Sequence, residues 1–288
     1  NKISDLLKNR FNINHSKVLV FAIFLAYFSF LIRPTILQNL NGTFVKKTVP
    51  SEYISLNNYL SSQKGFYRTL WIPNTQLFGY FSNANPTISG RDFFREYDQN
   101  RLLSKLNKEE SQKTLDYSGV KYVIVPFDSE KEIYLKERKY DDKKYQKIVN
   151  SIDKLSWLKK DKQFGKIIVY KTKNYKDHFW CECIAEIKYE RVNPAKYRVS
   201  IQNATEGDRL IFSEAFDRRW VARNDNLKIE SKPFDDRFNS FALTQGSYEL
   251  EVYYLPQNLV NLGVKISLST LGLMASIWVI TLAIKHKK

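Results

Sequence analysis

The feature that most constrains this chain is an uncharged apolar run near its C-terminus. Residues 266–284 carry no charged side chain, and a basic tail, residues 285–288, follows them. A helix rises about 1.5 Å per residue, so this run would measure roughly 28 Å, close to the roughly 30 Å of bilayer hydrocarbon. A helix in a soluble core rarely needs such a length without a polar face. The run therefore predicts a transmembrane helix over residues 262–284.

A strand pattern stands directly before this helix. Leu250, Val252 and Tyr254 alternate with Glu249 and Glu251, and a proline follows two residues later. Such a period of two is typical of a strand that buries one face. We therefore expect a folded β domain to be attached closely to the membrane helix.

A second apolar run lies near the N-terminus, where residues 18–32 stand between Lys17 and Arg33. This run would span only about 22 Å as a helix, so we expect a helix over residues 17–37 whose flanking cations reach the headgroups. A signal peptide is the alternative interpretation. Residues 29–34 offer no small-x-small cleavage site, which favours an uncleaved anchor.

Basic residues on the outer side of each run predict the topology. Lys8, Arg10 and Lys17 come before or at the start of the first run, and the tail after the second contains three lysines. By the positive-inside rule, residues 1–16 and 285–288 are expected in the cytoplasm. The chain would then be a multi-pass protein of the cell membrane with an extracytoplasmic central part.

Composition indicates folded domains and excludes a nucleic-acid-binding chain. The 288 residues are 43% hydrophobic and 15% aromatic, which is sufficient for sizeable cores. The net charge of +16 is partly concentrated at the membrane flanks, and the remainder mixes both signs. Arg-rich helices, zinc-finger spacings and aromatic RNA-binding signatures are absent from the sequence, so no nucleic-acid partner is expected.

Residues 38–178 show helical and strand patterns in alternation. The expected helices cover residues 50–60, 101–117 and 140–158, and the expected strands cover 66–73, 119–126 and 166–171. Helix followed by strand is the arrangement of a small α/β unit. We expect this segment to form an external α/β domain.

Residues 179–258 show short strands at close spacing. The expected strands cover residues 184–189, 196–202, 208–213, 220–222, 238–243 and 248–254. Asn203, Gly207 and Gly246 mark turns between them, and this spacing predicts an external β-sandwich domain. The predicted fold class is an α+β membrane protein in which two transmembrane helices flank the α/β unit and the sandwich.

Candidate ligand-binding residues are acids near strand ends and one aromatic side chain. Glu214, Asp217 and Asp235 offer carboxylates that could accept sugar hydroxyls, and Tyr80 lies in a loop rich in Asn, Gly and aromatic residues. Each also has a structural explanation, because Asp favours turns and aromatic loops pack. Paired carboxylates can also hydrolyse glycosides, but only at a separation that the sequence does not show.

The motifs of common enzymes are missing. The sequence contains no G-x-S-x-G, Walker A, H-E-x-x-H or G-x-G-x-x-G. We therefore predict no catalytic residue, no metal and no cofactor in this chain.

Trp220 has two interpretations, a sugar-stacking platform or a core residue. Strand alternation places Trp220 and Ala222 on one face and Arg219 and Arg223 on the other. Because the cationic face suits solvent, we expect Trp220 to face the core, opposite residues such as Phe212.

The two cysteines provide no disulfide framework. His178, Cys181 and Cys183 form an H-x-x-C-x-C pattern, whereas a structural zinc site needs four ligands. We expect the cysteines to pack as small apolar residues on a strand. The sequence leaves open whether they are free.

Several segments resemble a known family. They are residues 189–200, 203–204, 210–222 (Leu-Ile-Phe-Ser-Glu-Ala-Phe-Asp-Arg-Arg-Trp-Val-Ala), 239–246 and 253–257 (Tyr-Tyr-Leu-Pro-Gln), with residues 49–53, 68–73 and 118–125 earlier in the chain. They resemble the C-terminal part of YfhO-like bacterial membrane proteins. These are similar to the GT-C class of membrane glycosyltransferases, including arabinofuranosyltransferase-like members. One departure is Arg218-Arg219, where the family often has Pro-Gly.

The resemblance implies a function for the chain. It would form the last two membrane helices and the external module of a glycosyltransferase-like protein that acts on lipid-linked sugars or cell-envelope glycans. The implied partners are the lipid bilayer, a polyprenyl-linked sugar or envelope glycan, and a missing N-terminal transmembrane portion that would hold the catalytic carboxylate. None of the acids here inherits that role. The alternative is a non-catalytic, membrane-anchored glycan-binding or scaffold protein of the envelope.

Overall fold

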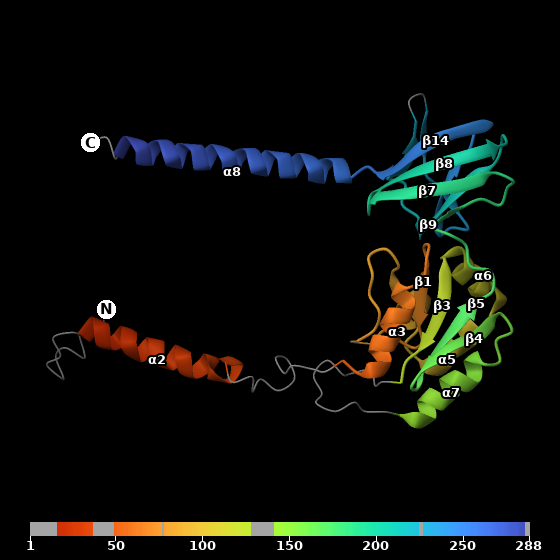
Figure 1. The fold of residues 1–288 in the computed structure, drawn as a ribbon, viewed down its shortest axis with the longest axis horizontal. Helices are drawn as coiled ribbons and strands as arrows, with labels where there is room; N and C mark the ends of the chain where they lie inside the picture. Colours follow the sequence, from red (N-terminus) through yellow and green to blue (C-terminus); the bar gives the residue numbers. More distant parts are fainter. Residues whose placement is uncertain (1–15, 37–48, 77, 128–140, 225–226, 286–288) are drawn as a thin grey trace.

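The computed structural model describes residues 16–36, 49–76, 78–127, 141–224 and 227–285 (Figure 1). It is an α+β protein with three sheets and, within the described residues, seven helices. Two folded domains are stacked on one another, and a long C-terminal helix leaves the upper one (Figure 1). The predicted α+β class is thus confirmed.

The first domain is built on a five-stranded mixed sheet with the order β2-β1-β3-β5-β4. The strands are β1 (Arg68–Trp71), β2 (Thr87–Ser89), β3 (Val120–Val125), β4 (Leu158–Phe164) and β5 (Ile167–Thr172). β1 runs parallel to β2 and β3, whereas β5 is antiparallel to β3 and β4. All six residues of β3 are buried, as expected for a central strand that is covered on both faces.

Helices cover both faces of this sheet. They are α3 (Ser51–Ser61), α4 (Gly90–Phe94), α5 (Gln99–Leu106), α6 (Glu109–Tyr117) and α7 (Asp142–Ile152). The predicted stripe of Tyr53, Leu56 and Leu60 on α3 is fully buried, in a cluster with Trp71. The apolar residues of α5, α6 and α7 form a second cluster with Leu70 and other residues of the sheet.

The structure corrects two of the expected elements. The predicted helix over 101–117 is two helices, which break at Asn107, and Ser111 Oγ donates a hydrogen bond to the Lys105 carbonyl there. The predicted helix over 140–158 ends at Ile152, and β4 begins soon after it. The sequence did not reveal β4, because five of its seven residues are exposed, as is typical of a charged edge strand.

The second domain consists of two sheets with the orders β11-β10-β14-β8-β7 and β12-β13-β9-β6. The strands are β6 (Phe179–Trp180), β7 (Glu186–Asn193), β8 (Lys196–Ala204), β9 (Arg209–Ala215), β10 (Trp220–Arg223), β11 (Lys228–Glu230), β12 (Lys232–Phe234), β13 (Phe238–Ala242) and β14 (Gly246–Tyr254). Their inner faces share one core, which includes Val199, Phe212, Phe241 and Leu250. The sheets thus pack as a sandwich, and the strands that the sequence missed, β6, β11 and β12, are only two or three residues long.

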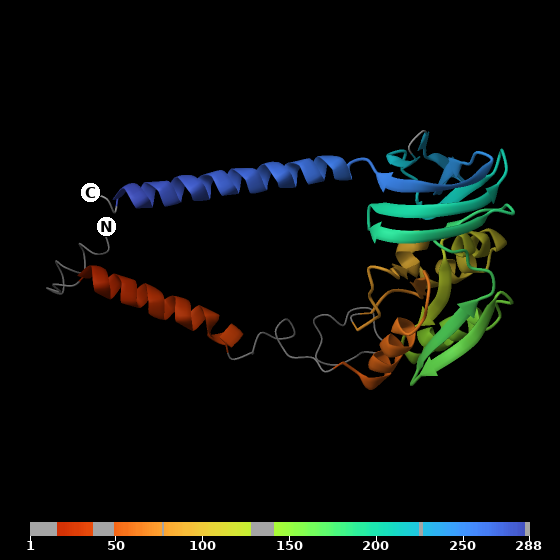
Figure 2. The same ribbon diagram turned by 45° about the horizontal axis from the view of Figure 1, so that its top comes forward.

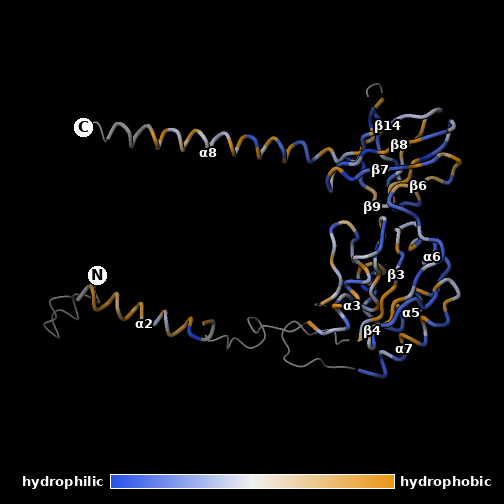
Figure 3. Tube along the Cα trace, in the orientation of Figure 1, coloured by the Kyte–Doolittle hydropathy of each residue, from blue (hydrophilic) through white to orange (hydrophobic). Residues whose placement is uncertain are grey.

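Helix α8 (Gln257–Lys285) follows β14 almost without a linker (Figures 1 and 2). It begins earlier than the predicted residue 262, and its hydropathy rises away from the sandwich (Figure 3). Within the described residues, α8 is the one helix long and apolar enough to cross a membrane. Helix α2 (Ser16–Ile36) forms where the N-terminal anchor was expected, but its apolar part, Val18–Arg33, is shorter. The membrane crossings by α8 and by α2 therefore stay predictions.

Candidate functional site

A cleft of about 600 Å³ lies where the two domains meet. The α/β domain contributes Phe66 and the segment 83–86, and the sandwich contributes residues from β7, β8, β9, β10 and β14. Aromatic side chains form much of its lining, and Glu214 and Asp217 are its carboxylates. The cleft is therefore a property of the domain pair and of neither domain alone.

Arg68 ties the two domains together behind this cleft. It lies on β1, is only 6% exposed, and donates hydrogen bonds from Nη1 to the carbonyls of Ser118 at 2.6 Å and Ser213 at 2.7 Å. Its Nη2 forms an ion pair with Glu214 Oε1 at 2.6 Å. One cation of the α/β domain thus binds both the backbone and a side chain of β9 in the sandwich.

His178 approaches the same carboxylate. Its Nε2 lies 2.8 Å from Glu214 Oε1, and its ring stacks on Phe66 with centroids 3.9 Å apart. Burial lowers the pKa of His178 more than the Glu214 carboxylate raises it, so the imidazole is neutral at pH 7 and its Nε2–H donates. Burial on its own would raise the pKa of Glu214, but the charge of Arg68 and the His178 hydrogen bond outweigh it and lower that pKa.

Glu214 keeps one oxygen available to the cleft. Both Arg68 and His178 bind Oε1, and Oε2 has no hydrogen-bond partner among the residues that the structure describes. The side chain is 36% exposed. Glu214 is thus a fixed, ionised hydrogen-bond acceptor at the wall of the cleft.

Half-exposed aromatic rings line the cleft together with this acceptor. Trp220 of β10 and Tyr254 of β14 are register partners with ring centroids 5.2 Å apart. Trp220 also packs edge-on against the core residue Phe212 at 4.9 Å. Tyr189 donates a hydrogen bond to Asp177 at 2.6 Å, and Phe216 is 37% exposed. These rings offer apolar faces, with the phenol hydroxyls of Tyr189 and Tyr254 held in place.

Asp217 lines the cleft, but its carboxylate is already occupied. It accepts hydrogen bonds from the Arg219 side chain and backbone and from the Tyr254 hydroxyl, the last at 2.9 Å. The Arg219 hydrogen bonds lower the pKa of Asp217 below its usual range. Asp217 therefore fixes the turn between β9 and β10 and positions Tyr254.

Of the four predicted site residues, two lie in the cleft and two lie elsewhere. Glu214 and Asp217 lie together in the cleft. Asp235 lies in the turn between β12 and β13 with a φ of 51°, and Tyr80 is 8% exposed in the core cluster with Tyr67. Neither of the latter two lines the cleft.

The structure modifies the expectation for Trp220. Its ring does pack against the sandwich core, where Phe212 lies, but it is half-buried and lines the cleft. The two interpretations of the sequence are thus compatible, because one face of the indole contacts the core and the rest is accessible.

Sequence reasoning missed Arg68 and His178. A signal for Arg68 was present, since it is a single cation within an otherwise apolar strand and such a charge needs a buried partner. The H-x-x-C-x-C pattern groups His178 with the cysteines, but its ring faces Glu214 and Phe66. Only the tertiary fold identifies Glu214 as the common partner of both.

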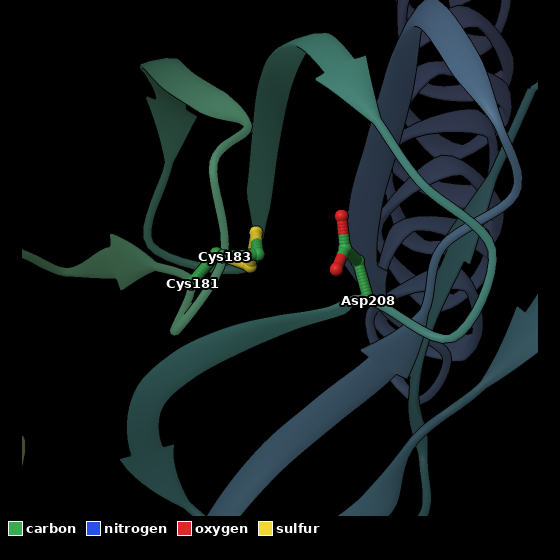
Figure 4. Close-up of side chains that lie close together, drawn as sticks. All are labelled: Cys181, Cys183 and Asp208. Atoms are coloured by element: carbon green, nitrogen blue, oxygen red, sulfur yellow. A yellow bond between two sulfur atoms is a disulfide. The ribbon is translucent and has the colours of Figure 1, made fainter.

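The two cysteines are half-exposed and form a disulfide with each other (Figure 4). The expectation that they pack as small apolar residues is therefore wrong. Asp208 lies close to both sulfur atoms, within 4.8 Å, and the three residues have the composition of a small metal site. Sulfur atoms joined in a disulfide are not thiolate ligands, so the structure does not favour a metal here.

The arrangement is suited to holding a ligand between aromatic faces and a fixed carboxylate. No protein-family model, curated protein or solved structure matches this chain. The resemblance to YfhO-like membrane proteins therefore stays a prediction that rests on the residues named for it.

Proposed function

We propose that the two domains bind the sugar portion of a cell-envelope glycan or lipid-linked sugar in the interdomain cleft. The observation that carries this proposal is the cleft itself, in which Trp220, Tyr254 and other rings surround the available Oε2 of Glu214. Aromatic faces pack against the C–H faces of sugars, and a carboxylate accepts their hydroxyl hydrogens.

The charges around the cleft favour a neutral ligand. Glu214 is balanced by Arg68 and Asp217 by Arg219. Arg191, the remaining cation of the lining, donates a hydrogen bond to the Asn83 carbonyl at 2.7 Å. Each carboxylate thus has an arginine partner, and Arg191 keeps its positive charge beside a carbonyl. The cleft therefore offers shape, aromatic surface and hydrogen bonds with little net charge.

The same charges favour binding over hydrolysis. A glycosidase needs one carboxylic acid whose raised pKa keeps it protonated as a general acid. The pKa values of Glu214 and Asp217 are both lowered, so both are ionised at neutral pH. A binding role for this module is compatible with catalysis elsewhere in a glycosyltransferase-like protein and equally with a non-catalytic envelope scaffold.

We further propose that α8 anchors this module and that both domains lie outside the cytoplasm. The length and composition of α8 support the anchor, and the basic flanks of the apolar runs support the orientation. The disulfide between Cys181 and Cys183 also supports it, because disulfides persist mainly in oxidising compartments.

The test measures glycan binding by the full chain in lipid nanodiscs. An array of envelope oligosaccharides that includes arabinofuranose and N-acetylhexosamine oligomers selects a ligand, and calorimetry then measures its affinity. Glu214→Gln removes the charged acceptor and Phe216→Ala removes an exposed ring, so each should weaken binding roughly tenfold. Asp235→Asn is the control, because Asp235 lies outside the cleft and Asn tolerates a positive φ.

Thermal melting separates binding from folding. Phe216→Ala should leave the melting temperature unchanged, because the ring is exposed and lies outside the core clusters. If every oligosaccharide fails to bind the wild-type chain, or if Phe216→Ala and Glu214→Gln bind as the wild type does, the cleft is not a glycan site.

A further inference from the structure

The end of the sandwich from which α8 leaves is defined by backbone hydrogen bonds. Tyr254 N donates to the Ala195 carbonyl at 2.9 Å, and Leu255 N donates to the Arg219 carbonyl at 3.0 Å. The hairpin between β7 and β8 and the turn before β10 are thereby fixed beside the start of α8. These segments lie closest to whatever surface α8 enters.

The α/β domain reaches the same end through its loop between β1 and β2. Arg191 of β7 donates a hydrogen bond to the carbonyl of Asn83 in this loop at 2.7 Å. Figures 1 and 2 both show the loop and the β7–β8 hairpin on the side of the domains toward which α8 extends. Both domains therefore contribute to one rim around the base of α8.

Apolar side chains protrude from this rim. Phe81 of the loop is 81% exposed, and Val192 of the hairpin is 43% exposed. Single exposed apolar residues are common on protein surfaces, so exposure alone would carry no conclusion. Here the two come from different domains, and the segments that hold them both lie on the side toward which α8 extends.

The charges near the start of α8 are predominantly positive. The cations are Lys196, Arg218, Arg219 and Arg223, and the carboxylates are Asp217 and Glu251. Asp217 pairs with Arg219, and Glu251 pairs with both Lys196 and Arg223. Cations beside exposed apolar residues are the composition of a surface that contacts anionic lipid headgroups.

We infer that this rim, composed of Phe81, Val192 and the cations beside the α8 base, rests on the headgroup layer of the membrane that α8 crosses. The occupant is the bilayer, because the rim lies on the side from which α8, the one described helix suited to a membrane, leaves the domains. The inference rests on the proposed anchoring by α8 and goes beyond it. It fixes the orientation of both domains, whereas a flexibly tethered module would tumble above the membrane.

The experiment measures the depth of single labelled positions in the full chain. Phe81→Cys, Val192→Cys and Ile184→Cys each carry an environment-sensitive fluorophore in nanodiscs that contain anionic lipids and headgroup-attached nitroxides. Ile184 is the matched control, since it is 89% exposed and precedes the opposite end of β7. At about 3.3 Å per strand residue, the part of β7 between Glu186 and Val192 alone spans roughly 20 Å.

The labels at positions 81 and 192 should lose most of their fluorescence, whereas the label at 184 should lose little. Equal quenching at all three positions would overturn the inference. A fourth variant, Leu271→Cys on α8, with nitroxides in the acyl chains, reports on the anchor itself. If the label at 271 is quenched but those at 81 and 192 are not, the rim contact is wrong and the anchor stands. If the label at 271 is not quenched, the proposed anchor is wrong as well.

Discussion

Arg68 of β1 and Glu214 of β9 form an ion pair across the domain boundary, with 2.6 Å between Nη2 and Oε1. The two residues are 146 positions apart in the sequence. The guanidinium also donates to the Ser213 carbonyl of β9 and to the Ser118 carbonyl of its own domain, so it connects the two domains through both the backbone and a side chain. The same ion pair fixes which oxygen of Glu214 faces the cleft. Domain docking and the binding site therefore depend on one interaction.

Replacing Arg68 with methionine should destabilise the folded domains. The change removes a buried guanidinium, takes its ionic partner from Glu214 and leaves the Ser118 and Ser213 carbonyls without their donor, at a cost of about 3 kcal/mol in the free energy of unfolding. Urea denaturation of the full chain in nanodiscs, followed by tryptophan fluorescence, measures this. Arg219→Met is the control, because the Arg219 guanidinium is exposed in its pair with Asp217. This variant should lose much less unfolding free energy. Equal losses would contradict a special role for Arg68.

Acidification should destabilise the protein first through His178. Its pKa is lowered in the fold, so below the ordinary value of about 6.5 the unfolded chain takes up a proton that the folded chain does not. The contribution of His178 to stability therefore falls as the pH drops below about 6.5. Glu214, whose pKa is also lowered, stabilises the fold above its ordinary pKa and loses that contribution only at lower pH. Asp116, whose pKa burial raises to about 6, acts in the opposite direction.

His178→Gln tests this assignment. Glutamine can still donate to Glu214 but does not titrate. The loss of stability below about pH 6.5 should therefore become shallower. Urea denaturation at several pH values gives the slope for each protein. Parallel slopes for the two proteins would show that another group governs this range.

Trp220→Ala should lower both stability and glycan affinity. Because Trp220 is half-buried and packs on Phe212, we expect a loss of roughly 2–3 kcal/mol, below the roughly 3–5 kcal/mol of a buried tryptophan. Trp180→Ala provides the comparison, since Trp180 is 6% exposed and lies outside the cleft. A larger loss of unfolding free energy in Trp220→Ala than in Trp180→Ala would contradict the half-buried position of Trp220.

The orientation in the membrane can be tested with one new thiol. Glu206→Cys places it in the exposed turn between β8 and β9, and the native cysteines are joined in a disulfide. We expect an impermeant maleimide to label this variant on intact cells and to leave the wild-type chain unlabelled. Labelling that appears only after lysis would place the domains in the cytoplasm.

Elements with a strong local pattern could be predicted from the sequence. The stripe on α3 and the alternation in β14 each repeat at the period of the element they form. The largely apolar run of β3 is typical of a strand that is buried on both faces. The uncharged run of α8 needs no partner to be recognised, because its length alone matches a bilayer. Edge strand β4 lacked such a signal, since backbone pairing with β5 and not burial of its side chains holds it in the sheet.

The candidate site was decided by tertiary structure. Glu214 and Asp217 were recognised as acids beside strand ends, but their residue type says nothing about their partners. Arg68 occupies Oε1 of Glu214 and leaves Oε2 available, whereas Arg219 and Tyr254 occupy Asp217. Asp235, of the same type and in a similar sequence context, lies outside the cleft. Local sequence patterns determine which residues form strands and turns. Which side chains meet in the cleft is determined by the packing of the two domains, because that packing brings together segments that are far apart in the chain.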